Sequence, residues 1–222
     1  MGTDIVSGNR PAPSTLIMLV RHGVTPTTGQ VLPGRAPGLH LSEVGRGQSR
    51  TVAQRLAGVP LAAIYTSPME RTQETAAPSA ELFGLTPVVC EGLVECDFGE
   101  WTGGKLAELS QLPEWNTVQK TPSEFRFPGG ESFAEMQDRM VEALAAIAER
   151  HRGEVVACFS HADPIKAAVA HLSGRTLDQF QAITVDPASI SVAEFFPDGR
   201  TAMVGTNSTT GQLKDLRWRG QP

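Results

Sequence analysis

The chain has 222 residues, a formal net charge of -5 at pH 7, 40% hydrophobic residues and 19% charged residues. This length and composition suit a globular protein with a real hydrophobic core. The acidic balance and the lack of a long basic run exclude duplex nucleic acid as a partner. No apolar stretch approaches membrane-spanning length, and the N-terminus lacks the pattern of a secretory signal. We therefore expect no membrane association and a cytoplasmic location.

The domain boundaries follow from composition. Residues 1–14 are rich in Gly, Pro, Ser and Asn without any period, which predicts a disordered lead-in. We expect one domain over residues 15–206 and a loose tail over residues 207–222. The three cysteines form no C-x-x-C pair, and their odd number argues against a disulfide framework.

The first predicted strand, residues 16–20, ends abruptly in Arg21, His22 and Gly23. A buried strand that stops in this way presents its first polar side chains at the carboxyl edge of the sheet, where open α/β folds bind ligands. Gly23 lets the backbone turn sharply or approach a ligand closely. Arg21 offers a planar fork of donors that suits a phosphate, and His22 offers a nucleophilic nitrogen.

A long irregular segment, residues 23–41, follows and is typical of a binding loop or lid. A helix is predicted over residues 42–56, with Ser42 as N-cap and Val44, Val52 and Leu56 on its inner face.

The second predicted strand, residues 61–66, leads directly into a helix over residues 69–82. We expect Ser67 to cap this helix and Pro68 to occupy its first position. Arg71 stands in its first turn, and a helix N-terminus at the carboxyl end of a strand is an anion site by geometry.

A short third strand, residues 86–90, precedes an acidic loop over residues 93–103. Glu95, Asp97 and Glu100 in this loop are alternative candidates for a general acid. Residues 106–127 predict short helical pieces that cover the site.

The last third of the chain predicts a capping box at Ser132 and Glu135, which starts a helix that runs to residue 151. A fourth strand, residues 154–159, ends in Ser160 and His161 and leads into a helix over residues 165–172. A short helix around residues 177–183 and a hairpin of two strands, residues 189–196 and 201–206, complete the domain.

Alternating strands and helices predict an α/β three-layer sandwich, with a mostly parallel central sheet and helices on both faces. The right-handed crossover rule then places all the strand carboxyl ends on one edge, which gathers Arg21, His22, Arg71, Glu95 and His161. The group contains no cysteine and no helical H-x-x-x-H pair, so we expect neither a metal nor another cofactor. Cations that bind phosphate oxygens, a nitrogen nucleophile and a carboxylic acid match phosphoryl transfer from a small phosphorylated substrate.

The chain resembles the histidine phosphatase superfamily in its phosphoglycerate-mutase-like branch. The resemblance rests on five motifs in order: residues 19–23 (LVRHG), 66–76 (TSPMERTQETA), 93–103 (LVECDFGEWTG), 130–132 (GES) and 160–161 (SH). It implies that His22 is the phosphorylated nucleophile and that Arg21, Arg71 and His161 bind the phosphate, with His161 counted in the catalytic set. By motif position it also implies that Glu95 is the general acid and later the base that activates water.

Several positions depart from the family pattern. Val24 follows R-H-G where an acidic or amide residue is usual, and Thr28 falls near the place of a phosphate-holding asparagine. Asp163 and Pro164 follow the second histidine where glycines are frequent. The paired arginines that grip a phosphoglycerate carboxylate in the mutases are missing, since residues 102–129 hold only Lys105, Lys120 and Arg126 as cations.

These departures favour a metal-independent phosphatase over a phosphomutase. A catalytically silent domain that only binds a phosphorylated ligand is a third hypothesis, and a homodimer is compatible with the sequence. Arg35, in the segment of residues 23–41, is a candidate for substrate contact or a surface residue.

Overall fold

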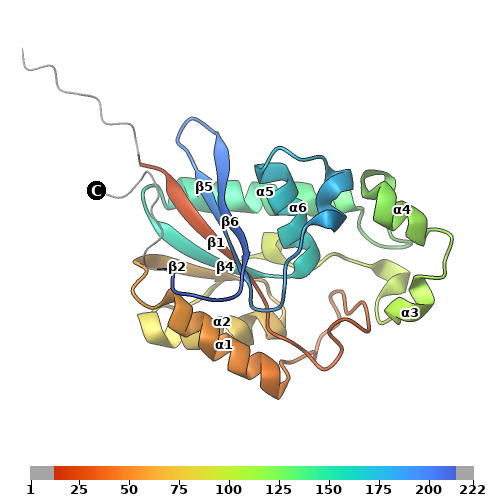
Figure 1. Ribbon diagram of the computed structural model, residues 1–222, viewed down its shortest axis with the longest axis horizontal. Coiled ribbons are helices and arrows are strands. Elements are labelled where there is room, and N and C mark those ends of the chain that lie inside the picture. Colours follow the sequence, from red (N-terminus) through yellow and green to blue (C-terminus); the bar gives the residue numbers. More distant parts are fainter. Residues whose placement is uncertain (1–12, 214–222) are drawn as a thin grey trace, which may run out of the picture.

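The computed structural model describes residues 13–213, in which a six-stranded sheet lies between layers of helices (Figure 1). The strand order is β3-β2-β4-β1-β5-β6. The elements follow one another along the chain as β1 (Thr15–Arg21), α1 (Glu43–Leu56), β2 (Leu61–Thr66), α2 (Glu70–Phe83), β3 (Val88–Val89), α3 (Leu106–Leu109), α4 (Trp115–Lys120), α5 (Phe133–Arg150), β4 (Val155–Ser160), α6 (Ala162–Leu172), β5 (Ile190–Phe195) and β6 (Thr201–Ser208). Short 3-10 turns, η1 to η4, span Glu91–Leu93, Gly99–Trp101, Pro122–Glu124 and Leu177–Ala182.

The sheet is parallel from β3 through β2 and β4 to β1, and the hairpin of β5 and β6 adds two antiparallel strands. In this register Arg21 lies opposite Ser160, and Thr66 lies opposite Phe159. The carboxyl ends of β1, β2 and β4 therefore meet at one edge of the sheet. This arrangement confirms the predicted α/β class with a mostly parallel sheet.

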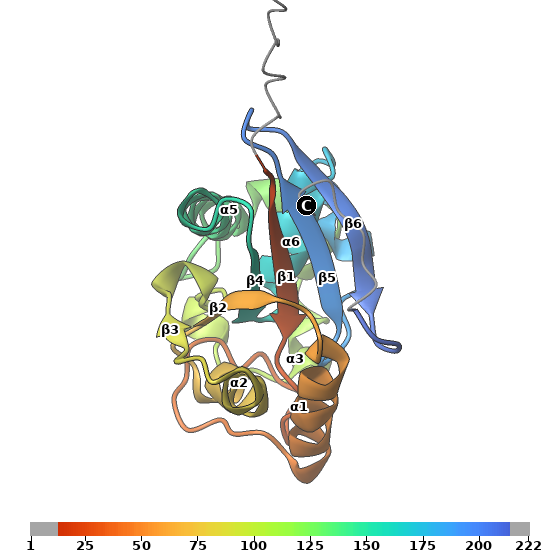
Figure 2. The ribbon, with the colours of Figure 1, turned by 90° about the vertical axis from the view of Figure 1, so that its left-hand side faces the viewer.

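Helices α5 and α6 cover one face of the sheet, and α1 and α2 cover the other (Figure 2). Because successive strand residues point to opposite faces, Ile17 and Leu19 join the apolar cluster on the α5 side, whereas Met18 and Val20 join the cluster on the α1 side. All four side chains are buried. Burial of each such side chain contributes about 1.5 to 3 kcal/mol, which fixes the strand that carries Arg21 and His22.

The inner face of α1 differs from the prediction. Val44 is 64% exposed, and Gly45 takes the inward position, followed by Ser49, Val52 and Leu56. A Cβ at Gly45 would lie 2.1 Å from the carbonyl oxygen of Val24, so the helix start needs a glycine there. The close packing of these two segments also explains Gly23, because a Cβ there would lie 2.8 Å from the carbonyl oxygen of Gly45.

The start of α2 also differs from the prediction. Met69 is the N-cap and makes no side-chain cap, and the helix begins at Glu70. Ser67 Oγ instead lies 2.8 Å from His161 Nε2, because β2 and β4 are neighbours in the sheet. Helix α6 begins at Ala162, three residues before the predicted start, with Pro164 inside its first turn.

The predicted capping box of α5 is confirmed, since Ser132 Oγ accepts a hydrogen bond from Glu135 N–H and the Glu135 side chain accepts one from Ser132 N–H. Strand β3 is shorter than predicted.

Both ends of the described chain are held by specific contacts. Ser14, which falls in the predicted lead-in, is buried and donates a hydrogen bond to Glu194 Oε1, while residues 1–12 lie outside the described residues. After β6, the buried Arg55 guanidinium donates to the carbonyl oxygens of Ser208, Thr210 and Gly211. The first part of the predicted loose tail is thus fastened to α1, and residues 214–222 lie outside the description.

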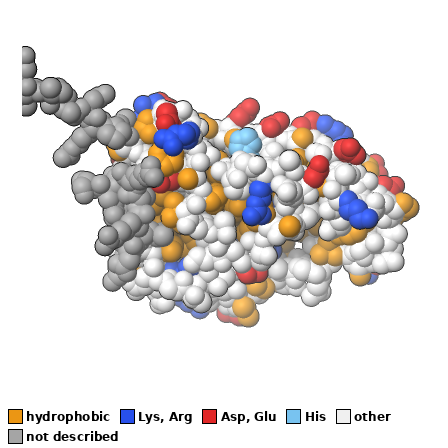
Figure 3. Space-filling view, turned by 45° about the horizontal axis from the view of Figure 1, so that its top comes forward, with side chains coloured by type: hydrophobic (Ala, Val, Ile, Leu, Met, Phe, Trp, Pro, Cys, Tyr) orange, Lys and Arg blue, Asp and Glu red, His pale blue; other side chains and the backbone are white. Residues whose placement is uncertain are grey.

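Between residues 13 and 213, no helix is long and apolar enough to cross a membrane. On the face that Figure 3 displays, acidic and basic side chains are scattered among each other and form no continuous basic patch.

Candidate active site at the carboxyl edge of the sheet

The structure brings together all five side chains that the sequence places at the sheet edge. Arg21 ends β1 and His22 follows it, Arg71 lies in the first turn of α2, and His161 is the N-cap of α6. Glu95 lies in the loop between η1 and η2. The rings of His22 and His161 are 5.3 Å apart between centroids.

His22 is oriented by its own backbone. Its Nδ1 lies 2.7 Å from the carbonyl oxygen of Gly23, and because a carbonyl only accepts, Nδ1 carries the proton. Nε2 then holds the free lone pair. Burial and, to a lesser degree, the charges of Arg71 and Arg21 lower the pKa of His22 to about 3. The imidazole is therefore neutral at physiological pH, and its Nε2 lone pair is available.

Two arginines supply buried cationic donors. Arg71 is fully buried, and one of its nitrogens, Nη2, donates to the carbonyl oxygen of Gly34 at 2.8 Å. Arg21 Nη1 donates to the carbonyl oxygen of Val185 at 2.7 Å. Arg71 Nε and Nη1 and Arg21 Nε are buried and have no hydrogen-bond partner within residues 13–213. Buried donors of this kind are costly unless an anion binds them, so the arrangement suits a phosphate group.

His161 completes this set of donors. Ser67 Oγ accepts a hydrogen bond from Met69 N–H at 3.3 Å and lies 2.8 Å from His161 Nε2, a contact in which either group can be the donor. His161 Nδ1 is buried and has no partner among the described residues. Burial is the main cause that lowers the pKa of His161 well below its usual value. A neutral His161 acts as a hydrogen-bond donor without adding a positive charge.

Glu95 is the carboxyl group of the site. It is buried, and its Oε1 accepts a hydrogen bond from Cys96 N–H at 2.9 Å. Burial raises the pKa of Glu95 to about 7, helped by the charge of Asp163 and opposed by that of Arg71. Its Oε2 lies 3.8 Å from His161 Nδ1, beyond hydrogen-bond distance. Near neutral pH the carboxyl group exchanges its proton readily, as a general acid and base must.

The backbone of Glu95 is held by two arginines that the sequence analysis did not place there. Arg139 Nη2 and Arg35 Nε both donate to the carbonyl oxygen of Glu95, at 3.1 and 2.9 Å. Both arginines pair with Glu131, the middle residue of the GES motif. Arg35 therefore contacts the acidic loop, and Arg139 was missed because it stands beside the apolar stripe of α5 and carries no motif signal.

A second anchor holds Arg21. The segment of residues 185–189 runs past the end of β1, where Ala188 N–H donates to the carbonyl oxygens of Arg21 and His22 at 3.1 and 3.2 Å. Ala188 adopts a φ of 60°, a left-handed conformation that is uncommon for a side chain with a Cβ. No sequence motif marks this segment, because its carbonyl and amide groups are common to all residues.

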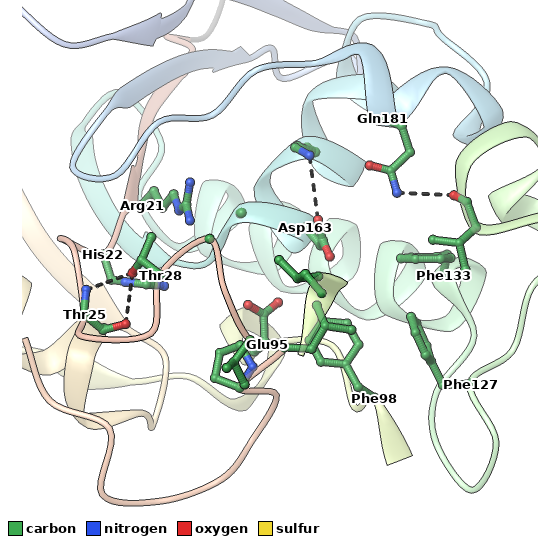
Figure 4. Close-up of a pocket in the computed structure, with 18 of the residues that line it drawn as sticks. Arg21, His22, Thr25, Thr28, Glu95, Phe98, Phe127, Phe133, Asp163 and Gln181 are labelled. Atoms are coloured by element: carbon green, nitrogen blue, oxygen red, sulfur yellow. Dashed lines mark hydrogen bonds and ion pairs between the residues drawn. The ribbon is translucent and has the colours of Figure 1, made fainter. Parts of the chain in front are cut away.

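Arg21, His22 and Glu95 line a pocket of about 270 Å³, whereas Arg71 and His161 are buried and are not among its lining residues. Figure 4 shows Arg21 and His22 at one end of the pocket and the aromatic rings of Phe98, Phe127 and Phe133 at the other. The Thr28 side chain lines the pocket near Arg21, where its Oγ1 accepts a hydrogen bond from Thr25 N–H.

Asp163 also lines the pocket, in the first turn of α6. The other two acid candidates lie apart from it, since Glu100 is exposed and Asp97 caps the N–H of Gly99. In the described part of the chain, no group of three His, Cys, Asp or Glu side chains could hold a metal ion.

Known proteins share this sequence pattern. The sequence profile of the histidine phosphatase superfamily (branch 1) matches residues 17–208. A bifunctional protein of Mycobacterium tuberculosis is 34% identical over 207 residues, which are 91% of this chain and 56% of that protein. The chain thus spans about half the length of its first mycobacterial relatives (56%). Phosphoserine phosphatase 1 of Hydrogenobacter thermophilus is 34% identical over 181 residues, which are 79% of this chain and 84% of the relative.

Solved structures share the fold. A mycobacterial glucosyl-3-phosphoglycerate phosphatase superposes with a TM-score of 0.80 at 23% identity, covering 88% of this chain and 99% of that one. Bacillus stearothermophilus YhfR superposes with a TM-score of 0.81 at 28% identity, covering 88% of this chain and 98% of that one. Because the profile match extends over most of the sequence, the chain belongs to the histidine phosphatase superfamily, branch 1.

Proposed function

We propose that the protein hydrolyses small phosphomonoesters without a metal, through a phosphohistidine on Nε2 of His22. The observation that carries this proposal is the position of a neutral imidazole, with its Nε2 lone pair available, among buried cationic donors that have no partner in the described part of the chain. We further propose residues 15–206 as its single domain and the cytoplasm as its compartment.

In the first half-reaction, the phosphate of the substrate binds to Arg21, Arg71 and His161. His22 Nε2 attacks phosphorus, and the bond from phosphorus to the ester oxygen breaks. Glu95 gives its proton to that oxygen, and the alcohol leaves. The raised pKa of Glu95 supports this role, because a large share of the groups is protonated at pH 7.

In the second half-reaction, the Glu95 carboxylate takes a proton from water as the water oxygen attacks phosphorus. The bond from phosphorus to Nε2 breaks, and His22 returns to its neutral form while inorganic phosphate leaves. The cations of Arg21 and Arg71 stabilise the charge on the phosphoryl oxygens in both steps.

A phosphomutase is the alternative, since it would return the phosphoryl group to a second hydroxyl group instead of to water. Hydrolysis is favoured because the pocket walls offer no pair of arginines for a phosphoglycerate carboxylate. The relative at 34% identity, phosphoserine phosphatase 1, also supports hydrolysis. A silent binding domain is less favoured, because it has no need of a carboxyl group with a pKa near 7.

The test is phosphate release from 4-nitrophenyl phosphate in the presence of EDTA, with the parent protein and the His22→Ala variant. We expect EDTA-resistant release in the parent and a loss of about 10³-fold or more in the variant, because the nucleophile is removed. His40→Ala is the matched control, since His40 is exposed and pairs with Glu74 on the surface. Its activity is expected to stay at the parent level.

Two results would contradict the proposal. Activity that survives in His22→Ala would remove His22 as the nucleophile. Activity that EDTA abolishes would make the reaction metal-dependent. Should neither protein release phosphate, transfer of acid-labile phosphate from substrate to His22 would separate the mutase from the silent binder.

A further inference from the structure

The part of the pocket that receives the leaving group is apolar. Beyond His22, the walls are formed by aromatic rings and aliphatic side chains from the loop after β1, the acidic loop, the cover of residues 106–127 and the first residue of α5. Its apolar lining consists of Val31, Leu32, Pro33, Phe98, Leu106, Trp115, Val118, Phe127 and Phe133.

This apolar wall is held in place by backbone contacts. Val31 and Lys105 form an isolated β-bridge, and Leu32 N–H donates to the carbonyl oxygen of Gly104 at 3.0 Å. Trp115 stacks on the buried Trp101, with ring centroids 6.2 Å apart and planes inclined by 20°. The loop after β1 and the cover therefore form one continuous wall.

The same end of the pocket offers almost no free positive charge. Lys166 and Arg21 are the only Lys or Arg residues that line the pocket in the described part of the chain. Lys166 Nζ lies 3.9 Å from Asp163 Oδ1, and Arg21 is held by the carbonyl oxygen of Val185 beside the nucleophile. A carboxylate on the leaving group would thus lose its hydration without gaining an unpaired cation.

We propose that the protein selects phosphomonoesters whose alcohol carries a compact, uncharged apolar or aromatic group, and that it discriminates against alcohols that carry a carboxylate. The inference deepens the proposed function and rests on it. The volume of about 270 Å³ suits a phosphate group together with a leaving group of about one or two rings, because drug-sized ligands occupy pockets of about 300 to 1,000 Å³. Trp115 is the specificity-determining residue, since its half-buried ring faces the pocket from the cover.

The test compares 2-phenylethyl phosphate with 2-carboxyethyl phosphate, two primary alkyl esters that differ in the group at the far end. We expect kcat/KM to be higher for the phenylethyl ester by about tenfold or more, since its ring is buried and the carboxylate has no partner. Trp115→Ala should lower kcat/KM for the phenylethyl ester by about tenfold and leave that for the carboxyethyl ester within about twofold.

A charge-insertion variant tests the same idea without removing core packing. Gln119 is exposed and lines the pocket, so Gln119→Arg places a cation at the apolar end. We expect this variant to raise kcat/KM for the carboxyethyl ester by about tenfold. Gln111→Arg, on the exposed surface between α3 and α4, is the matched control and should change neither ester.

Equal kcat/KM for the two esters in the parent, with both activities lost in His22→Ala, would overturn this inference and leave the proposed function intact. A preference for the carboxyethyl ester that disappears in Lys166→Met would overturn it as well and assign the carboxylate to Lys166. If neither ester is hydrolysed and 4-nitrophenyl phosphate is not hydrolysed either, the proposed function fails. Calorimetric binding of the corresponding phosphonates then decides the selectivity, and tighter binding of the carboxylate analogue would refute it.

Discussion

At the scale of single residues, Glu95 links the proposed catalysis to stability. Its carboxyl group is buried near Arg71 and His161, yet among the described residues its one hydrogen bond comes from Cys96 N–H. The free energy of burying the charge outweighs the attraction of the cations, and the pKa rises to about 7. A group in this state can donate a proton in one step and accept one in the next.

The pH dependence of kcat/KM for an alkyl phosphate is the first prediction at this scale. We expect kcat/KM to fall as the pH rises through about 7, because the first half-reaction needs protonated Glu95. Glu95→Gln should lower kcat/KM by about 10²- to 10⁴-fold, and its kcat/KM should no longer fall as the pH rises through about 7. Rate profiles from pH 5 to 9 measure both effects.

The controls for this prediction are Asp97→Asn and Glu100→Gln, which change the other two acids of the same loop. In both variants kcat/KM should still fall as the pH rises through about 7. If the fall of kcat/KM near pH 7 disappears in Glu100→Gln but remains in Glu95→Gln, the general acid is Glu100.

The same pKa shift makes a prediction about stability. The pKa of Glu95 in the folded protein is raised from 4.5 to about 7, so its contribution to folding is fully present below pH 4.5 and is lost as the pH rises through 7. Glu95→Gln should therefore be more stable than the parent at pH 8, by up to about 3 kcal/mol, and gain little at pH 5. Urea unfolding at the two pH values measures the difference, and a gain independent of pH would contradict it.

At the scale of elements, the start of α5 positions much of the acidic loop. The helix carries Arg139, which donates to the carbonyl oxygens of Gly92, Val94 and Glu95. Its N-terminus is fixed by the Ser132 capping box. The apolar stripe of the helix then sets its rotation, since Met136, Met140 and Leu144 are fully buried and lie in the same core cluster as Phe133, Ile147 and Ala148.

Removal of the cap is the prediction at this scale. Ser132→Ala should lower the free energy of unfolding by about 1 kcal/mol, because the N–H of Glu135 loses its acceptor. Ser123→Ala, at an exposed serine in η3, is the matched control and should change stability by less than about 0.5 kcal/mol. Equal losses in the two variants, in thermal or urea unfolding, would contradict a role for the cap.

At the scale of the whole molecule, hydrogen bonds connect the hairpin of β5 and β6 to the candidate active site. Asn207, near the end of β6, accepts a hydrogen bond from Asp186 N–H at 2.7 Å and donates to Asp186 Oδ2 at 2.8 Å. Asp186 follows Val185, whose carbonyl oxygen holds the Arg21 guanidinium. The last strand thus supports Arg21, which we propose binds phosphate, through the segment of residues 185–189.

Asn207→Gly tests this connection. Asn207 has a φ of 51°, which glycine adopts freely, so the variant removes the side-chain hydrogen bonds without adding backbone strain. We expect inhibition by inorganic phosphate to weaken by about fivefold, equivalent to about 1 kcal/mol, because Arg21 is less well held. Thr206→Ala, at an exposed neighbour on β6, should leave inhibition unchanged. An unchanged inhibition constant for phosphate in Asn207→Gly would show that the Asn207 side chain does not help to position Arg21.

The sequence by itself determined the fold class and placed the five candidate side chains at one edge of the sheet. Buried strands are visible as apolar runs, and parallel strands bring their carboxyl ends to one edge, so Arg21, His22 and His161 could be placed together from their positions at strand ends. The capping box of α5 is local, and it too could be read from the residues.

The tertiary structure alone decided what surrounds those residues. Val44 turns outward because Gly45 must meet the backbone of Val24, a contact between segments that no local pattern reveals. Ser67 bonds His161 instead of capping α2, since the register of β2 on β4 sets its neighbours. Burial and the interactions between charged groups depend on how segments remote in the sequence pack together. This packing raises the pKa of Glu95, and it also brings together the apolar side chains that line the pocket.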